Sequence, residues 1–169
     1  MTLFELIEAG DKDGLAGALA DDPELAGRRN ADGLSPVLVA LYNGRAELVG
    51  RILDANPALD VFDAAAVGRT RGLEALLEDD PGLAQAWSVD GFTPLHLAAF
   101  FGQEDAARLL LDRGADPRAV STHAEIKVAP AQSAAAGEHD SIVRLLLERG
   151  ARPEDFENDE IRARYADDA

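Results

Sequence analysis

Cysteine is absent from the 169 residues of this chain. Its absence excludes a disulfide framework, a thiol nucleophile and any metal site built from thiolates. Histidine is scarce, with three residues in the whole chain. Two of them, His123 and His139, lack the second ligand at i, i+4 or nearby that a zinc site requires. The sequence therefore predicts neither a metal nor any other cofactor.

Motifs of catalysis are also missing. The chain contains no GxGxxG fingerprint, no P-loop and no serine elbow. The strongest candidates for acid–base chemistry are the carboxylate pairs Asp21-Asp22 and Asp79-Asp80. Each pair is followed by a proline and recurs at the same place in the two halves of the chain, which indicates turn chemistry at a helix end. We therefore expect no catalytic residue and no enzymatic activity.

Positive charge is in short supply. The chain has 16 lysines and arginines against 32 acidic residues, which gives a formal net charge of −16. Such a field repels nucleic acid phosphates and anionic membrane surfaces. The N-terminal stretch "MTLFELIEAGD" lacks the basic region of a signal peptide, and no run approaches the ~18 apolar residues of a membrane-spanning helix. We expect neither nucleic acid nor membrane as a partner, and a cytoplasmic location.

What the sequence does contain is an internal duplication. Residues 3–54 align without a gap on residues 61–112, at a constant offset of 58 positions. The tripeptide "DDP", the dipeptide "DG" and a proline three residues after that glycine recur in register in both halves. Each half divides again into two similar helical pairs. Self-similarity at a fixed period is the signature of a repeat architecture.

The best-formed repeat runs from Asp90 to Ala119. It has a "DG" turn, Thr93 at the N-cap, Pro94 at the first helical position, an alanine-rich helix, a turn at Gly102 and a second helix "EDAARLLL". The stretch "DGFTPLHLAAFFGQEDAARLLLDRGADP" resembles an ankyrin repeat, because it joins the "TPLH" helix start, the central glycine and the "GAD" end at the spacings of that family.

A further repeat follows at an offset of 36 residues, with Ala129 in place of Thr93 and Gln132 in place of His96. The resemblance implies an all-α solenoid of stacked helix-turn-helix repeats with β-hairpin fingers. It also implies that His96 hydrogen-bonds to backbone and to the threonine, and so ties one repeat to the next.

We interpret the chain as a single ankyrin-repeat domain over residues 1–153. First helices are expected near 2–9, 36–43, 60–67, 94–101 and 130–136, in repeats spanning about 1–29, 30–58, 59–86, 87–119 and 120–153. Fingers are expected around 28–34, 86–92 and 119–128, the last being longer than usual. The connection "LDANPALDVF" is too short for a finger.

The acidic segment 154–169 has two interpretations. Phe156, Ile161 and Tyr165 are spaced nearly as on one helix face, so a short helix could cover the last repeat as a cap. Its charge and terminal position equally suit a mobile tail.

Aromatic residues are few, yet four of them gather in one repeat. Phe100 and Phe101 follow "LAA", Phe92 lies beside the "DG" turn, and Trp87 lies on the same finger. In ankyrin proteins these positions face the ligand on the concave side and vary with the partner. A simpler alternative is that Phe92 and one of Phe100 and Phe101 pack on the long third finger, or fill the gap left by the missing one.

The sequence thus predicts a non-enzymatic protein–protein interaction module that binds a partner on its concave face. The acidic charge favours a partner with a basic segment. Three alternatives stay open: an inhibitor or regulatory subunit of a specific enzyme or toxin, a small-ligand binder, and self-association through the apolar face. The predicted partner-binding residues are Trp87, Phe92, Phe100, Phe101, Tyr42, Arg29 and Leu34.

Overall fold

The computed structural model of the chain describes residues 1–166. The described residues form eleven α-helices and three short 3-10 helices, without a strand. This confirms the all-α architecture. By its contacts the chain divides into two compact units, an N-terminal unit Met1–Leu59 and a C-terminal unit that begins at Asp60. The division falls within the short connection that leaves no room for a finger.

The N-terminal unit consists of two helical pairs. Its helices are α1 (Leu3–Ala9), α2 (Lys12–Asp21), α3 (Pro36–Tyr42) and α4 (Ala46–Asp54), with the 3-10 helix η1 (Pro23–Gly27) after α2. Helix α1 packs on α3 and helix α2 on α4. The side chains between them are fully buried aliphatic residues: Ile7, Leu15, Leu38, Leu48 and Ile52.

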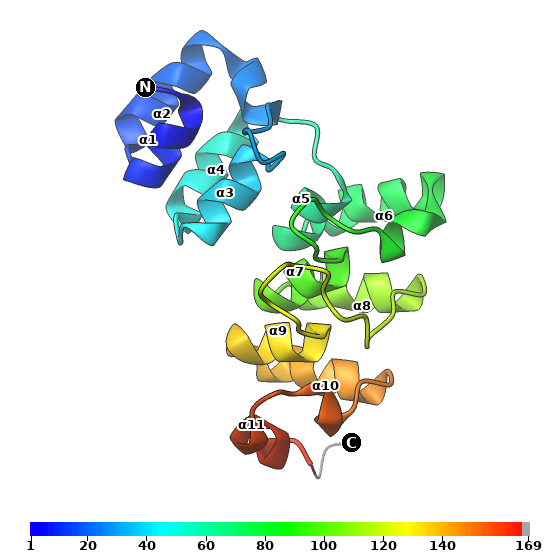
Figure 1. The fold of residues 1–169 in the computed structure, drawn as a ribbon. Coiled ribbons are helices and arrows are strands. Elements are labelled where there is room, and N and C mark those ends of the chain that lie inside the picture. Colours follow the sequence, from blue (N-terminus) through cyan, green and yellow to red (C-terminus); the bar gives the residue numbers. More distant parts are fainter. Residues whose placement is uncertain (167–169) are drawn as a thin grey trace. The chain divides into compact units, whose positions relative to one another are not determined.

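The C-terminal unit continues the same pattern (Figure 1). Its first helices α5 (Val61–Ala66), α7 (Pro94–Phe100) and α9 (Pro130–Ala136) pack in a row, and so do its second helices α6 (Thr70–Asp79), α8 (Glu104–Asp112) and α10 (Asp140–Glu148). The first helices approach closely because the residues between them are small. Ala65, Ala98, Ala99, Ala131 and Ala134 are all fully buried there.

Local sequence explains where the first helices begin. Ser35 and Thr93 each cap a helix by accepting a hydrogen bond from a backbone N–H three residues on, and a proline follows each at the first helical position. Helices α1, α3, α5, α7 and α9 lie within one residue of the positions expected from the sequence. Starts of this kind depend on a few neighbouring residues, which makes them predictable.

The predicted fingers occur as closed loops rather than as paired strands in the part of the chain that the structure describes. A backbone hydrogen bond closes each loop, across 30–34, 88–92 and 121–128, with N–O distances of 2.9, 2.9 and 2.8 Å. The third loop is longer, as expected. Two of the loops are directly joined, because the Thr122 N–H donates to the Gly91 carbonyl at 2.9 Å.

The described part of the acidic segment folds against the last helical pair. It contains the 3-10 helix η3 (Pro153–Asp155) and helix α11 (Asp159–Arg164). Phe156 and Tyr165 are each 1% exposed, and their rings stack at a centroid distance of 5.6 Å. The Tyr165 hydroxyl donates to Asp140 on α10, and the Glu157 N–H donates to the side-chain oxygen of Gln132 on α9. Residues 167–169 lie outside the described part.

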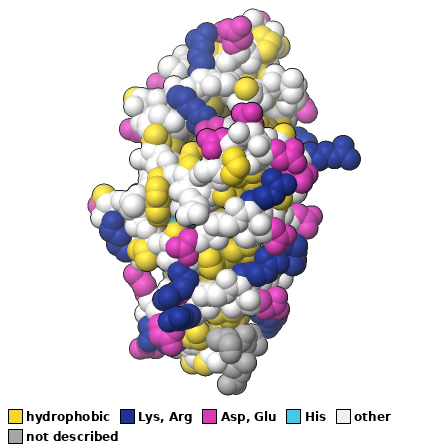
Figure 2. Space-filling model, turned by 90° about the vertical axis from the view of Figure 1, so that its right-hand side faces the viewer, with side chains coloured by type: hydrophobic (Ala, Val, Ile, Leu, Met, Phe, Trp, Pro, Cys, Tyr) yellow, Lys and Arg dark blue, Asp and Glu magenta, His cyan; other side chains and the backbone are white. Residues whose placement is uncertain are grey.

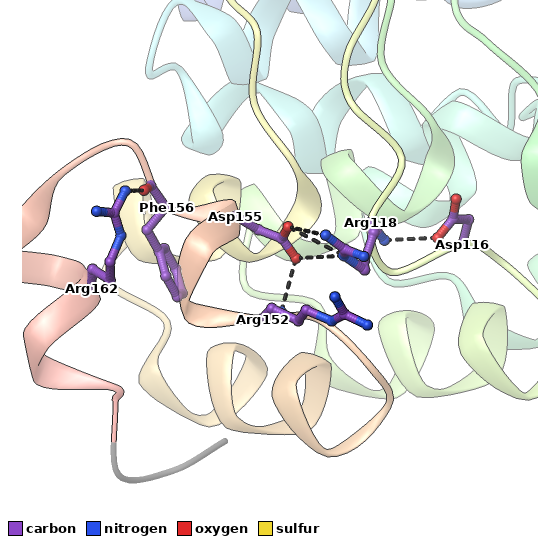
Figure 3. A network of polar contacts seen from close by, with 6 residues as sticks. All are labelled: Asp116, Arg118, Arg152, Asp155, Phe156 and Arg162. Atoms are coloured by element: carbon purple, nitrogen blue, oxygen red, sulfur yellow. Dashed lines mark hydrogen bonds and ion pairs between the residues drawn. The ribbon is translucent and has the colours of Figure 1, made fainter.

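A polar network anchors this segment to the preceding repeat (Figure 3). The Arg118 guanidinium donates to both carboxylate oxygens of Asp155, at 3.0 to 3.2 Å. Asp155 also accepts the Arg152 backbone N–H at 2.8 Å. On the other side of Phe156, Arg162 donates to its carbonyl oxygen at 2.8 Å. Charged groups thus hold the backbone on both sides of the buried Phe156 ring.

Glu138 occupies a backbone conformation that glycine holds in the other helical pairs. Its φ is 61°, whereas the corresponding turns have positive φ at Gly10, Gly44, Gly68 and Gly102. A left-handed conformation brings Cβ too close to the backbone, at a cost of about 1–2 kcal/mol for a residue other than glycine.

We therefore expect Glu138→Gly to raise the free energy of unfolding by about 1 kcal/mol, after allowance for the greater freedom of glycine in the unfolded chain. Urea denaturation followed by circular dichroism measures this change. Glu138→Ala is the matched control, because alanine keeps the strained Cβ and should give little gain. Equal gains in the two variants would contradict the explanation.

Candidate partner-binding face

His96 is the centre of the polar and aromatic contacts around α7. It is 1% exposed, and its Nδ1 lies 3.2 Å from the Thr93 backbone nitrogen and 2.8 Å from the Thr93 hydroxyl. Because Nδ1 accepts the backbone N–H, the proton of the neutral ring belongs on Nε2. That nitrogen lies 2.9 Å from the Val128 carbonyl, so His96 donates to the end of the third finger.

Two aromatic rings lie beside this histidine, and one of them also contacts the third finger. Trp87 lies 6.2 Å from His96 between ring centroids, and Phe92 lies 5.9 Å from it in an edge-on arrangement. Phe92 also stacks on His123 of the third finger at 5.5 Å. Phe92 is half-buried, whereas Trp87 remains 44% exposed. Phe92 thus packs under the long finger, and Trp87 presents its ring to solvent.

Phe100 and Phe101 close the other end of α7. Their rings meet edge to face at 5.0 Å, with Phe100 42% exposed and Phe101 half-buried. The Phe100 carbonyl accepts a hydrogen bond from His139 at 3.0 Å. Residues four apart share one side of a helix, so Phe100 lies on the same side of α7 as His96. We call the three exposed residues Trp87, Val89 and Phe100 the aromatic face.

Charged residues are nearly absent from the elements that carry the aromatic face. Between residues 86 and 102 Asp90 is the single acidic residue, with no lysine or arginine, and α9 has no charged residue. The ion pairs lie on other elements, such as Glu104 with Arg108 on α8 and Asp112 with Arg149 after α10. Figure 2 shows acidic and basic side chains interspersed in this way on one face of the molecule.

Three predicted residues belong to the N-terminal unit. Arg29 is exposed at the start of its finger, Tyr42 is 40% exposed at the end of α3, and Leu34 is half-buried. The Leu34 N–H donates to the Asn30 side chain at 2.8 Å, which fixes the finger turn. A role of these three residues in partner binding stays a prediction.

Sequence reasoning missed two exposed apolar residues of the third finger. Val120 is 56% exposed and Ile126 is 47% exposed. Their exposure follows from the extra length of this loop, which holds them away from the helices. The stacking of His123 on Phe92 was missed too, since only the folded loop brings these rings together.

Comparison with known proteins identifies the architecture. The family model described as ankyrin repeats, in three copies, matches residues 5–121 and again residues 61–158. The chain belongs to the ankyrin-repeat family. The resemblance read from the "TPLH" repeat is thereby confirmed, whereas the count of five repeats stays a prediction. Ankyrin repeats are generally protein–protein interaction modules, and the family is typically non-enzymatic.

The chain is also similar to segments of plant proteins. It is 45% identical over 65 residues to E3 ubiquitin-protein ligase XB3 of Oryza sativa subsp. japonica, and 32% identical over 108 residues to E3 ubiquitin-protein ligase KEG of Arabidopsis thaliana. It is 40% identical over 72 residues to serine/threonine-protein kinase VIK of Arabidopsis thaliana. These matches cover 38%, 57% and 43% of this chain but 14%, 7% and 15% of the relatives.

Residues 1–166 contain no group of three or more histidine, cysteine, aspartate or glutamate side chains placed to hold a metal ion. Within the same residues no helix is both long and apolar enough to cross a membrane.

His96 makes the free energy of unfolding depend on pH. Burial lowers the pKa of His96 from 6.5, while hydrogen bonding to the backbone of Val128 and Ala119 opposes the shift. The unfolded chain therefore takes up a proton near pH 6.5, and the folded chain takes it up at lower pH. The stabilisation of the fold by the neutral His96 ring is complete above about pH 6.5. It is lost as the pH falls toward the pKa of His96 in the folded state.

We expect His96→Gln to reduce this loss of stability on acidification, because glutamine does not titrate. Glutamine already stands at the corresponding position of the next repeat, Gln132. Urea midpoints of both proteins at several pH values between about 7.5 and 5.5 measure the effect. The same slope in wild type and variant would show that His96 does not carry it.

Proposed function

We propose that this chain is a non-enzymatic interaction module that binds another protein through the aromatic face of its C-terminal unit. The observation that carries the proposal is the exposure of Trp87, whose ring lies beside the buried His96, and of Phe100 at the end of α7. Exposed apolar groups of this size usually mark a contact surface. Aromatic anchors of this kind are also frequent hot spots, where truncation costs about 2 kcal/mol or more.

The contacts beneath the two anchors support a preorganised surface. His96 is fixed by hydrogen bonds to Thr93 and Val128, and the half-buried Phe101 supports Phe100 from the side. Side chains held in this way lose little freedom when a partner binds, so more of the contact energy appears as affinity. Phe92 contributes by holding the third finger. Tyr42, Arg29 and Leu34 are proposed as further partner-binding residues, within the N-terminal unit.

Site-specific photo-crosslinking tests the proposal. Benzoylphenylalanine is placed at Phe100, and at Arg108 on helix α8 as a control, because Arg108 is exposed and pairs with Glu104 on the same helix. In a lysate of the source cells we expect a protein crosslinked from position 100 and absent from position 108. Excess unlabelled wild type should abolish this product, whereas excess Trp87→Ala/Phe100→Ala double variant should not. Equal competition by the two proteins would refute the proposed face.

The acidic charge leads to a kinetic expectation for the partner found in this way. A net charge of −16 attracts a basic segment and accelerates encounter at low ionic strength. The aromatic face itself has almost no charge, so dissociation should respond weakly to salt. Raising the salt concentration should therefore lower the association rate constant more than it changes the dissociation rate constant, as stopped-flow measurements can show. A salt-independent association rate would exclude a basic partner.

A further inference from the structure

We propose that His123 makes the tip of the third finger, residues 123–126, a pH-sensitive loop that is ordered near neutral pH and mobile in acid. The side chain holds the tip through hydrogen bonds that require a neutral ring. The base of the same finger is held by hydrogen bonds that survive protonation, so the response is confined to the tip. This device does not depend on the proposed function.

The His123 ring organises the backbone of the tip. Its Nδ1 accepts the backbone N–H of Glu125 at 3.1 Å and that of Ile126 at 3.2 Å. The same ring stacks on Phe92 at a centroid distance of 5.5 Å. Residues 124–127 are exposed, so packing against the helices does not fix them. One ring nitrogen therefore orders two peptide groups of a segment that has few other constraints.

A proton on Nδ1 is incompatible with both of these hydrogen bonds. In the neutral ring that makes them the proton belongs on Nε2, which leaves the lone pair of Nδ1 free to accept. The imidazolium carries a proton on each nitrogen, so its Nδ1–H would point at the N–H groups of Glu125 and Ile126. Histidine is the side chain that changes its charge between about pH 5 and 8. The order of the tip is therefore present where the ring is neutral and is lost as the pH falls.

The hydrogen bonds at the base of the finger do not require a neutral side chain. The Ser121 N–H donates to the Val128 carbonyl at 2.8 Å, and the Val128 N–H donates to the Ser121 hydroxyl at 3.0 Å. The Thr122 N–H joins the finger to the Gly91 carbonyl. His96 also donates to the Val128 carbonyl, but through Nε2, which carries a proton in both charge states of the ring. Protonation thus leaves the base closed.

Few charged or titratable side chains surround the tip. Apart from His123 they are Asp90 on the second finger, Glu125 and Lys127 on the third, and His96 on α7. Carboxylates and lysine ordinarily keep their charge in the range where histidine changes it. The Phe92 ring contacts both histidines, and an aromatic face attracts a cation, so the His123 ring can stay on Phe92 after it is protonated. Acid therefore releases the backbone of the tip rather than the stacked ring.

Backbone ¹⁵N relaxation of the full chain measures the order of the tip at about pH 7.5 and at about pH 5.5. In the wild type we expect the order parameters of the Glu125 and Ile126 amides to fall from about 0.85 to below about 0.6 on acidification. The amides of Ser121 and Val128, at the base of the same finger, should keep their values and serve as an internal control.

Two substitutions at position 123 separate the hydrogen-bond acceptor from the ring. His123→Asn keeps an acceptor that can bond to the N–H two residues on, and asparagine does not titrate. Its tip should therefore stay ordered at both pH values. His123→Phe keeps an aromatic ring toward Phe92 but has no acceptor, so its tip should be mobile at both pH values.

Four results would overturn the proposal. The first is a wild-type tip with the same order at both pH values. The second is a loss of order in His123→Asn equal to that of the wild type, which would assign the response to another group such as His96. An ordered tip in His123→Phe would mean that the two Nδ1 hydrogen bonds do not hold the backbone. A parallel loss of order at Ser121 and Val128 would mean that the whole finger responds rather than its tip.

Discussion

Replacing Phe156 by alanine is expected to lower the free energy of unfolding by about 3–5 kcal/mol, the range for a large aromatic side chain lost from a core. Phe156 is 1% exposed and stacks on Tyr165, which in turn hydrogen-bonds to Asp140. The lost ring leaves a cavity between the acidic segment and the last helical pair. Urea denaturation followed by circular dichroism measures the change.

Ile161→Ala is the matched control for this prediction. Ile161 lies on α11 in the same segment but is only half-buried, so its truncation should cost about 1 kcal/mol. The polar network around Asp155 and Arg162 is untouched by either substitution. If the two variants lose the same stability, the Phe156 ring does not anchor the segment in the way that its burial indicates.

Gly91→Ala is expected to lower the free energy of unfolding by about 3 kcal/mol, through two separate effects. Gly91 has φ 87°, which is strained for alanine. A Cβ there would also lie 2.3 Å from the His123 nitrogen and 2.7 Å from the Thr122 carbonyl carbon, both of them backbone atoms. The third finger would have to move away, which breaks the Thr122 hydrogen bond to the Gly91 carbonyl and the stacking of His123 on Phe92.

Gly114→Ala separates the two effects. Gly114 has φ 88°, nearly the same as Gly91, but a Cβ there would meet nothing within 4 Å. Its substitution therefore measures the cost of the backbone conformation alone, about 1 kcal/mol. Thermal denaturation of both variants gives the difference, which we assign to the collision with the third finger. Equal losses would show that the finger moves aside without cost.

The beginnings of the first helices could be predicted from the sequence, whereas the contacts of the fingers could not. A cap such as Thr93 followed by Pro94 acts within one turn, so the chain needs nothing distant to define the start of α7. The stacking of Phe92 on His123 depends on the shape of a loop about thirty residues further along.

The turn after α9 follows the register of the repeats rather than the position of its glycine. At the offset of 36 residues Glu138 corresponds to Gly102, and Gly137 corresponds to Phe101. Gly137 accordingly has φ −82° as the cap of α9, and Glu138 takes the left-handed conformation. Gly137 is needed for a different reason, the close approach of the Phe100 carbonyl. This requirement comes from packing between repeats, which a single repeat does not reveal.

Trp87 is the only tryptophan in the chain, and its ring is partly open to solvent in the C-terminal unit. Its fluorescence therefore reports on one unit, whereas far-ultraviolet circular dichroism reports on the helices of both. Denaturation curves that coincide by the two signals would mean that the units on either side of the finger-less connection unfold together. Separate midpoints would mean that the two units unfold independently. The same fluorescence can follow binding without a label, because a shift of the Trp87 emission to shorter wavelength on adding a partner would signal the removal of water from the aromatic face.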